Sequence, residues 1–537
     1  TFDNVADFYA DEIQFFRRSV GVDGVPLAAE SDFTTNGLFI QDTWDVNNRL
    51  TVNFGLRYDF VTTDRPVSEN PGRNGQSFEQ IFGTPNTNTM DGSELLAPRF
   101  SFQLDVDDEG LTKITGGLGL FMGRNPWVWV SNAYSNTGLN STDFFSPPSG
   151  NDRVNGGGLK GYLDNDFDPE NPVLFVSQDQ LGTGRSTIAL LAPDFDLPSI
   201  WKGNLNIEHR LSSESPWMAY AEMLVTKANT SIYTSNINLR EIGTTPDGRT
   251  RFAGSLGTAA NGNSEAYNDV YQLNNSSQGE SLNYTFGVRR SMRNNWSTDF
   301  SYTYGDSKDI SNQGSSTAWS NFAGNPIYNQ NTPELGTSAY ETEHRVLARL
   351  TYNMELAEGW DTNFNLTYIG QSGQNYSLLF DNDFNGDDAD FDNDLLYVPS
   401  GPNDSIIDTA NSSGLTEMFA YLDSLGVQRG QVVGRNSLRT DWRNNFDLNI
   451  TQNIPMRGRL QGQVYLNVLN VANLLNSKSG IINEVPFGTL AVASGTISPD
   501  GSQIAYSFNG GRGTSIRTGR YAQLSRWRIQ TGFKLLF

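Results

Sequence analysis

The sequence predicts an all-β protein whose strands form a transmembrane, antiparallel, up-and-down β-barrel wall. Three observations predict this fold class. Segments of about ten residues alternate apolar and polar side chains, as barrel strands do. The connections between these segments alternate between short and long. No apolar stretch approaches the roughly 18 residues that a membrane-spanning helix needs, although the chain of 537 residues is rich in Gly (53) and Phe (32).

The segment Leu50–Phe60 shows the alternation most clearly. Its apolar face carries Leu50, Val52, Phe54, Leu56, Tyr58 and Phe60, and its polar face carries Thr51, Asn53, Gly55, Arg57 and Asp59. The segments 296–304 and 360–368 repeat the pattern. Because successive side chains of a strand point to opposite sides of its sheet, each segment has one apolar and one polar face. We count thirteen such strands within residues 36–537.

Turn residues fill the short connections, such as 47–49, 107–110 and 293–295. The long connections cover residues 61–95, 123–199, 229–281, 306–342, 371–438 and 473–519. Short periplasmic turns and long extracellular loops are typical of outer-membrane barrels. Residues 1–35 are therefore interpreted as the tail of a preceding extracellular loop that includes one or two helical turns.

The distribution of charge favours a membrane barrel over a soluble sandwich. Charges are almost absent from the apolar faces, and aromatic residues such as Trp44, Trp217 and Trp296 gather near segment ends, as in interfacial girdles. A basic side chain at the lipid midplane costs about 2–4 kcal/mol, so charged residues should face the lumen. The arginines predicted to face the lumen are Arg57, Arg289, Arg349, Arg443, Arg526 and Arg528.

The last predicted strand ends in register on an aromatic residue. Its apolar positions are Trp527, Ile529, Phe533, Leu535 and the terminal Phe537. This pattern resembles the sorting signal read by the barrel assembly machinery of Gram-negative bacteria. We therefore expect that machinery as a partner and the outer membrane, with its lipid and lipopolysaccharide, as the location.

Six segments resemble TonB-dependent outer-membrane receptors, particularly the large Oar-like branch. They are Gly37–Trp44, Leu50–Asp59, Leu96–Phe100, Tyr302–Asp309, Asn393–Pro399 and Gly434–Arg439. Each motif is modest alone, and their order along the chain is specific. The resemblance covers most of residues 36–537.

This resemblance implies active uptake of a large or scarce solute through a plugged barrel of about 22 strands. Residues 36–537 would then be the C-terminal portion of that barrel, and about nine strands, the plug and the segment that binds a TonB-type energy-transducing partner would lie outside this chain. A surface lipoprotein is a further partner that the resemblance allows. Trp127 and Trp129, in the loop 123–199, are candidates for substrate contact.

Two alternatives stay open on function: a surface or structural outer-membrane protein with calcium-stiffened loops, and a passive porin. The lumen arginines also have two interpretations, because they could hold the plug or guide an anionic solute, or brace the wall through cross-strand charge pairs. The residues do not identify the transported substrate.

Composition argues against several other classes of protein. Lys and Arg total 37 and Asp and Glu total 60, and the net charge of −23 repels nucleic acid. The absence of cysteine removes thiolate metal sites and disulfides. We also find no G-x-S-x-G or H-E-x-x-H motif, so we do not expect an enzyme. No nucleotide or haem cofactor is expected either.

One acidic loop, 381–392, follows the spacing of a calcium-binding loop. The expected ligands are Asp381, Asp383, Asn385, Asp387 through its backbone carbonyl, and Asp392. Oxygen atoms at alternate positions can converge on one hard cation, and Gly386 permits the sharp turn. A solvated acidic loop without a metal is the alternative, and the sequence leaves both open.

Overall fold

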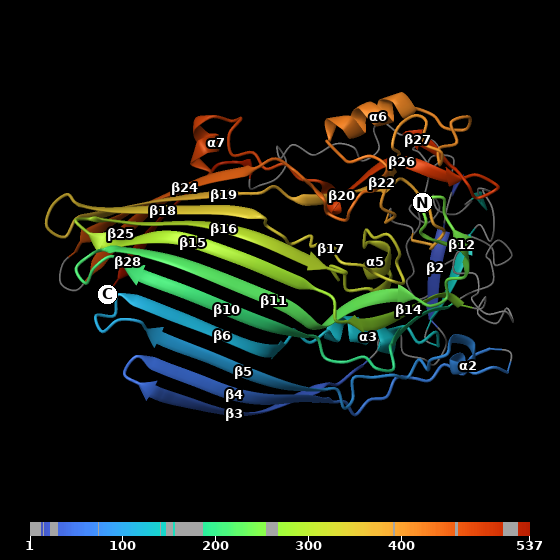
Figure 1. Ribbon diagram of the computed structural model, residues 1–537, viewed down its shortest axis with the longest axis horizontal. Helices are drawn as coiled ribbons and strands as arrows, with labels where there is room; N and C mark the ends of the chain where they lie inside the picture. Colours follow the sequence, from blue (N-terminus) through green and yellow to red (C-terminus); the bar gives the residue numbers. More distant parts are fainter. Residues whose placement is uncertain are drawn as a thin grey trace, which may run out of the picture.

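The computed structural model describes residues 30–73, 75–139, 186–253, 267–389, 393–456, 460–508 and 525–536, together with the backbone of short strands at 12–13, 16–21, 141–146 and 154–155. Most of the described residues belong to a large antiparallel sheet and to a layer of strands and short helices beyond one of its ends (Figure 1). Within these residues, every helix is too short or too polar to cross a bilayer.

Thirteen strands of the described chain form an antiparallel meander in which each strand pairs with its neighbours along the path. They are β3 (Thr34–Asn47), β4 (Leu50–Thr62), β5 (Glu94–Asp105), β6 (Thr112–Met122), β10 (Ser199–Arg210), β11 (Trp217–Asn236), β15 (Glu280–Arg293), β16 (Trp296–Asp309), β18 (His344–Glu355), β19 (Asp361–Gln371), β24 (Arg443–Pro455), β25 (Gln461–Leu469) and β28 (Arg528–Leu536). This confirms the predicted number and order of strands. The sheet is open, because β3 and β28 each pair on one side only among the described strands.

Tight turns join the strands at one end of the sheet. Between β15 and β16, Asn294 and Asn295 have φ of 51° and 68°, the left-handed conformation that a two-residue hairpin needs and that Asn tolerates. Between β5 and β6, the Asp107 carboxylate accepts the backbone N–H groups of Leu111 at 2.7 Å and Thr112 at 2.8 Å. Local side chains thus fix the predicted short turns.

The register of the sheet separates two chemically different faces. On one face, Leu350, Leu366, Leu448, Val468 and Ile529 form a continuous row across five strands. Several large apolar side chains on this face are exposed, including Leu350 (44%) and Phe533 (55%). A soluble protein rarely exposes an apolar surface of this extent, so this face is suited to contact lipid.

The opposite face of the same five strands carries hydrogen-bonding side chains. Thr351, Asn365, Asn449, Asn467 and Gln530 occupy successive partner positions. Thr351 Oγ1 lies 2.7 Å from Asn365 Oδ1, and Asn365 Nδ2 donates to Asn449 Oδ1 at 3.3 Å. Asn449 donates to Asn467, which donates to Gln530. We call these five residues the amide row.

The described parts of the long connections form a layer beyond the other end of the sheet. On one side, β11 extends to pair with β14 (Tyr267–Ser276), which lies parallel to β9 (Ser186–Leu191). On the other side, β20 (Asn375–Phe380) runs parallel to β26 (Thr489–Ile497), which pairs with β27 (Ile504–Phe508). Separate apolar clusters lie in these two parts, one around Val130 and Leu197 and one around Leu378 and Leu490.

Short elements complete this layer and connect its parts. The helices are α2 (Phe78–Phe82), α3 (Trp127–Ser135), α5 (Ala318–Ala323), α6 (Leu415–Ser424), α7 (Val471–Leu475) and the 3-10 helix η3 (Pro486–Gly488). The short strands are β1 (Glu12–Ile13), β2 (Phe16–Gly21), β7 (Ser141–Ser146), β8 (Val154–Asn155), β12 (Glu241–Thr244), β13 (Thr250–Phe252), β17 (Gly336–Thr337), β21 (Tyr397–Val398), β22 (Gln431–Val432) and β23 (Leu438–Arg439).

The one or two helical turns expected within residues 1–35 do not occur among the described residues of that segment. Residues Phe16–Gly21 form strand β2, which pairs with β7 from the loop 123–199. An isolated helix of one or two turns is unstable in water, whereas pairing with a second strand satisfies the backbone groups of both segments.

Candidate functional site

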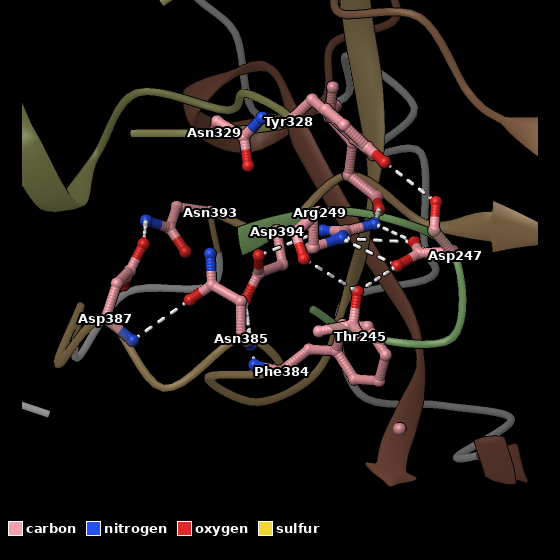
Figure 2. A network of polar contacts seen from close by, with 12 residues as sticks. Thr245, Asp247, Arg249, Tyr328, Asn329, Phe384, Asn385, Asp387, Asn393 and Asp394 are labelled. Atoms are coloured by element: carbon pink, nitrogen blue, oxygen red, sulfur yellow. Dashed lines mark hydrogen bonds and ion pairs between the residues drawn. The ribbon is translucent and has the colours of Figure 1, made fainter. Parts of the chain in front are cut away.

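Three loops of the outer layer meet around one buried arginine, Arg249 (Figure 2). Arg249 lies between β12 and β13, Tyr328 follows α5, and Asp394 lies in the segment that follows β20. The three come from the long connections 229–281, 306–342 and 371–438. We call this contact the Arg249 cluster, because the guanidinium binds groups from separate loops.

Arg249 is completely buried and fully bonded. Its Nη2 lies 2.5 Å from Asp247 Oδ2, its Nη1 lies 2.9 Å from Asp394 Oδ1, and its Nη2 also donates to the carbonyl of Leu395 at 2.6 Å. The side chains of Arg249, Asp247 and Asp394 are at most 1% exposed. Charge-assisted bonds of this kind are the strong ones, because no water competes for the charged groups.

Aromatic rings surround the same guanidinium. The Arg249 Cζ atom lies 5.1 Å from the ring centre of Phe384, 5.3 Å from that of Tyr328 and 5.6 Å from that of Phe380. A cation over an aromatic face gains electrostatic stabilisation that grows when water is excluded. Burial opposes the charge of Arg249, but Asp394 and Asp247 outweigh it and hold its pKa above the ordinary value.

The segment 381–389 forms a tight turn beside this cluster. Asp383 Oδ1 accepts the N–H groups of Gly386 at 2.7 Å and Asp387 at 3.0 Å, and its Oδ2 accepts that of Asp388 at 3.0 Å. Gly386 has φ of +81°, and a Cβ there would lie 2.4 Å from the carbonyl oxygen of Phe252. The turn therefore needs glycine for both its conformation and its contact with β13.

Three carboxylates crowd this turn. Burial, together with the charge of Asp394, raises the pKa of Asp383 to about 6 and that of Asp387 well above the ordinary value. Burial also raises the pKa of Asp394, although Arg249 opposes the rise. Asp387 accepts one backbone bond, from Ala389 at 3.0 Å, and Asn393 Nδ2 lies 3.4 Å from its Oδ2.

The structure brings together some of the predicted calcium ligands. Asp383, Asn385 and Asp387 lie in the turn, whereas Asp381 lies where the chain leaves β20 and donates its backbone N–H to Ala493 in β26. Asp392 lies outside the described residues. Over the described part of the chain, no three Asp, Glu or His side chains converge as a metal site.

The sequence did not identify Arg249, Asp247 or Asn393 as members of a site. Asn393 and Asp394 begin one of the segments on which the family resemblance rests, and that was the available signal. The Arg249 partnership joins positions 145 residues apart in the sequence, and no local spacing indicates it.

The two tryptophans proposed for substrate contact pack within the loop layer. Trp127 stacks on Phe33 with ring centres 4.5 Å apart, and Trp129 Nε1 donates to the carbonyl of Ser315 at 2.6 Å. Both rings are half-buried against the cluster around Val130. Their proposed contact with a substrate stays a prediction.

The arginines predicted for the lumen occupy different environments. Arg57 pairs with Asp59 at 2.6 Å within β4, and Arg289 pairs with Asp299 of the adjacent strand at 2.7 Å. Arg349 is exposed and opposite Asp299 in register, while the buried Nε of Arg443 has no hydrogen-bond partner within the described ranges. Arg526 and Arg528, at the start of β28, are exposed. The cross-strand pair of Arg289 and Asp299 fits the bracing interpretation, whereas Arg57 pairs within its own strand.

A hollow of about 580 Å³ lies against the polar face of β3 to β11. Its lining includes Arg99 and Lys202, which stand in one cross-strand row with Gly55 and Gly119. Both cations lie over the ring of Phe121, at 4.6 Å and 5.9 Å, and neither forms an ion pair among the described residues. Glycines beside them leave the two cations accessible. The lining also contains one carboxylate, Glu222, so the charged side chains of the hollow have an excess of one positive charge, which can attract an anionic group.

The described assembly residues lie on β28 or, for Trp527, directly before it. Trp527, Ile529, Phe533 and Leu535 are between 46% and 55% exposed and alternate with polar positions along the strand. Phe537 lies outside the described residues. The described part of the predicted pattern therefore presents one apolar face at an open edge of the sheet.

Comparison with known proteins gives a family match. Residues 1–503 match the family described as "Outer membrane beta barrel domain". The comparison with curated proteins finds no match.

Several solved structures are similar at low identity. The outer membrane transporter YddB from Escherichia coli is 12% identical with a TM-score of 0.42, over 82% of this chain and 41% of that chain. The FrpB iron transporter from Neisseria meningitidis is 10% identical with a TM-score of 0.39, over 95% and 47%. BauA, the ferric preacinetobactin receptor from Acinetobacter baumannii, is 10% identical with a TM-score of 0.39, over 94% and 43%. The chain spans less than half the length of each.

Proposed function

Because the chain belongs to the outer membrane beta barrel domain family and lies in the outer membrane of a Gram-negative bacterium, we propose that it forms part of the wall of a TonB-dependent transporter. The transporter actively takes up a large or scarce solute. Within that class, the sequence segments favour the Oar-like branch. Transport, and not catalysis, is the activity of the wall.

The two-faced meander of thirteen strands is the observation that carries this proposal. Its apolar face suits lipid, and its polar face suits a water-filled lumen. The hollow at Arg99 and Lys202 supplies a place on the polar face where an anionic part of the solute, or of a plug, can bind. The ordered loop layer beyond the wall provides the surface that a solute meets first.

In the proposed transporter, further strands close the wall in lipid. Among the described strands, the outer edges of β3 and β28 carry unpaired backbone groups, and each such group costs several kcal/mol inside the hydrocarbon layer. In the proposed transporter, these strands and a plug complete a barrel of about 22 strands. An energy-transducing TonB-type protein pulls the plug, the assembly machinery reads β28, and a surface lipoprotein is a further proposed partner.

Uptake by cells with and without the protein tests the proposal. Labelled solutes are offered to the deletion strain, to the complemented strain and to the complemented strain treated with a protonophore. We expect accumulation only in the untreated complemented strain, since active uptake draws on the inner-membrane proton gradient.

Two outcomes would contradict active transport. Influx that persists with the protonophore would indicate a passive porin. A structural protein would be indicated if the deletion strain took up every solute as fast as the complemented strain does but lost surface adhesion or the ordered cell surface. The Arg99→Glu, Lys202→Glu variant refines the test, because it should slow anionic solutes and leave neutral ones unchanged.

A further inference from the structure

Negative charge is in excess around the Arg249 cluster. Asp247, Asp383, Asp387 and Asp394 interact with one another or with Arg249, and Arg249 is the only basic side chain that forms an ion pair with any of them among the described residues. Asp387 is fully buried and forms no ion pair in this part of the chain. Buried carboxylates without a counter-ion are strongly disfavoured, so the turn needs further positive charge or protons.

Asn393 provides a second, independent indication of a ligand. It is 1% exposed, and its Oδ1 has no hydrogen-bond partner among the residues that the structure describes. Figure 2 shows its amide group turned towards Asp387 and Asn385. A buried oxygen acceptor without a partner is rare in folded proteins, and a bound ion is one of its ordinary explanations.

We propose that this turn binds one calcium ion through oxygen atoms of Asp383, Asn385, Asp387 and Asn393. Carboxylate and amide oxygens are the ligands that calcium prefers, and its flexible coordination suits two carboxylates combined with amides better than the strict octahedron of magnesium does. The Asp383 carboxylate accepts three backbone N–H groups, but its two oxygens offer about four acceptor positions. It can therefore hold the turn and contact the ion together.

This ligand set differs from the one that the sequence spacing predicts. Asp381 lies at the end of β20, and Asp387 contributes its buried carboxylate where the spacing assigns a backbone carbonyl. Asn393 joins the set from the far side of the loop. The bound ion would neutralise the excess charge and fix the turn against β13, where Phe252 N–H donates to the carbonyl of Asn385 at 2.7 Å.

Calcium binding to the full chain in detergent tests the proposal directly. After treatment with a chelator and its removal, equilibrium dialysis with radioactive calcium measures the number of bound ions and the Kd. Limited proteolysis with mass spectrometry then measures the rate of cleavage between 381 and 394. We expect one ion of this class per chain, and at ten times the Kd we expect about tenfold slower cleavage, because the ion binds the closed turn. Magnesium at the same concentration should give little protection.

Two variants and one control assign the ion to this turn. Asp387→Asn keeps the shape of the side chain and removes its charge, and should weaken binding more than about tenfold. Asn393→Asp should retain calcium binding but increase cleavage when calcium is absent, since it adds a buried charge. Asp423→Asn, which removes an equal charge from an exposed ion pair on α6, should bind as the original chain does.

Three results would overturn the proposal. The first is that the chain binds no calcium at millimolar concentration. The second is that Asp387→Asn leaves calcium binding unchanged, and the third is that calcium does not slow the cleavage of Asn393→Asp. The proposal does not depend on transport: failure of the uptake test leaves calcium binding to be measured on the purified protein.

Discussion

Replacing Arg249 by Met should open the contact between the extracellular loops. The change leaves Asp247 and Asp394 buried without their counter-ion, and it removes the bond to the Leu395 carbonyl. Removal of one partner from a buried ion pair typically costs about 3–5 kcal/mol. Because both carboxylates are at most 1% exposed, we expect about 4 kcal/mol, or roughly a thousandfold shift of the local opening equilibrium.

Hydrogen exchange measured by mass spectrometry on the full chain in detergent checks this magnitude. Amides of 249–252 and 393–396 should exchange roughly a thousandfold faster in Arg249→Met, while those of β15 and β16 stay protected. Arg429→Met is the matched control, because Arg429 pairs with Asp423 at the surface, where an ion pair contributes only about 0–1 kcal/mol. Exchange in Arg249→Met that equals the control would refute the reasoning. Adding Asp247→Asn and Asp394→Asn to Arg249→Met should restore most of the protection.

Three further predictions concern the turn, the wall and the response to acid. Gly386→Ala should destabilise the 381–389 turn by more than Gly501→Ala destabilises its own loop. Both glycines have positive φ, which costs Ala about 1–2 kcal/mol, but of the two only Gly386 has a backbone oxygen where the Cβ would lie. Hydrogen exchange of the two loops measures the difference in stability. Leu350→Arg should impair insertion into lipid vesicles by about 2–4 kcal/mol, whereas Thr351→Arg, on the polar face of the same strand, should insert normally; equal insertion would contradict the assignment of faces. Burial opposes ionisation of Asp404, but hydrogen bonds from Ser400, Ile406 and Tyr397 outweigh burial and lower the pKa of Asp404. The ionised carboxylate therefore stabilises this loop above about pH 4, and the stabilisation is lost as the pH falls through the lowered pKa. Exchange of residues 397–407 between pH 5 and pH 2.5 should show this loss in the original chain, and Asp404→Asn should lack it.

The wall was predictable because its information is local. Leu50–Phe60 alternates residue by residue, and the same alternation places each strand, its lipid face and its lumen face without knowledge of its partners. Tight turns such as Arg293–Trp296 then allow only antiparallel neighbours. Strand number, order and membrane location follow from these two regularities.

The loop layer was not predictable in the same way. Strand β20 runs parallel to β26, although more than a hundred residues separate them, and β20 shows no alternation because it is buried along its whole length. Arg249 likewise looks like an ordinary turn residue in Asp247–Arg249. Its role depends on Asp394 and on rings from other loops, which sequence spacing cannot bring together. The calcium-like spacing pointed to the acidic turn but not to the buried amide of Asn393 beside it.

The amide row has a consequence for any polar molecule inside the barrel. It lies beside a charged row made of Arg289, Asp299 and Arg349. On β18, Thr351 of the amide row lies two residues nearer to the short turns than Arg349 of the charged row does. Dissolved ions weaken the field of the charged row over about 8 Å at physiological ionic strength, but they scarcely affect a neutral amide. Binding of a polar molecule at the charged row should therefore vary with salt concentration. Binding at the amide row should depend only on the hydroxyl and amide groups that the molecule itself carries.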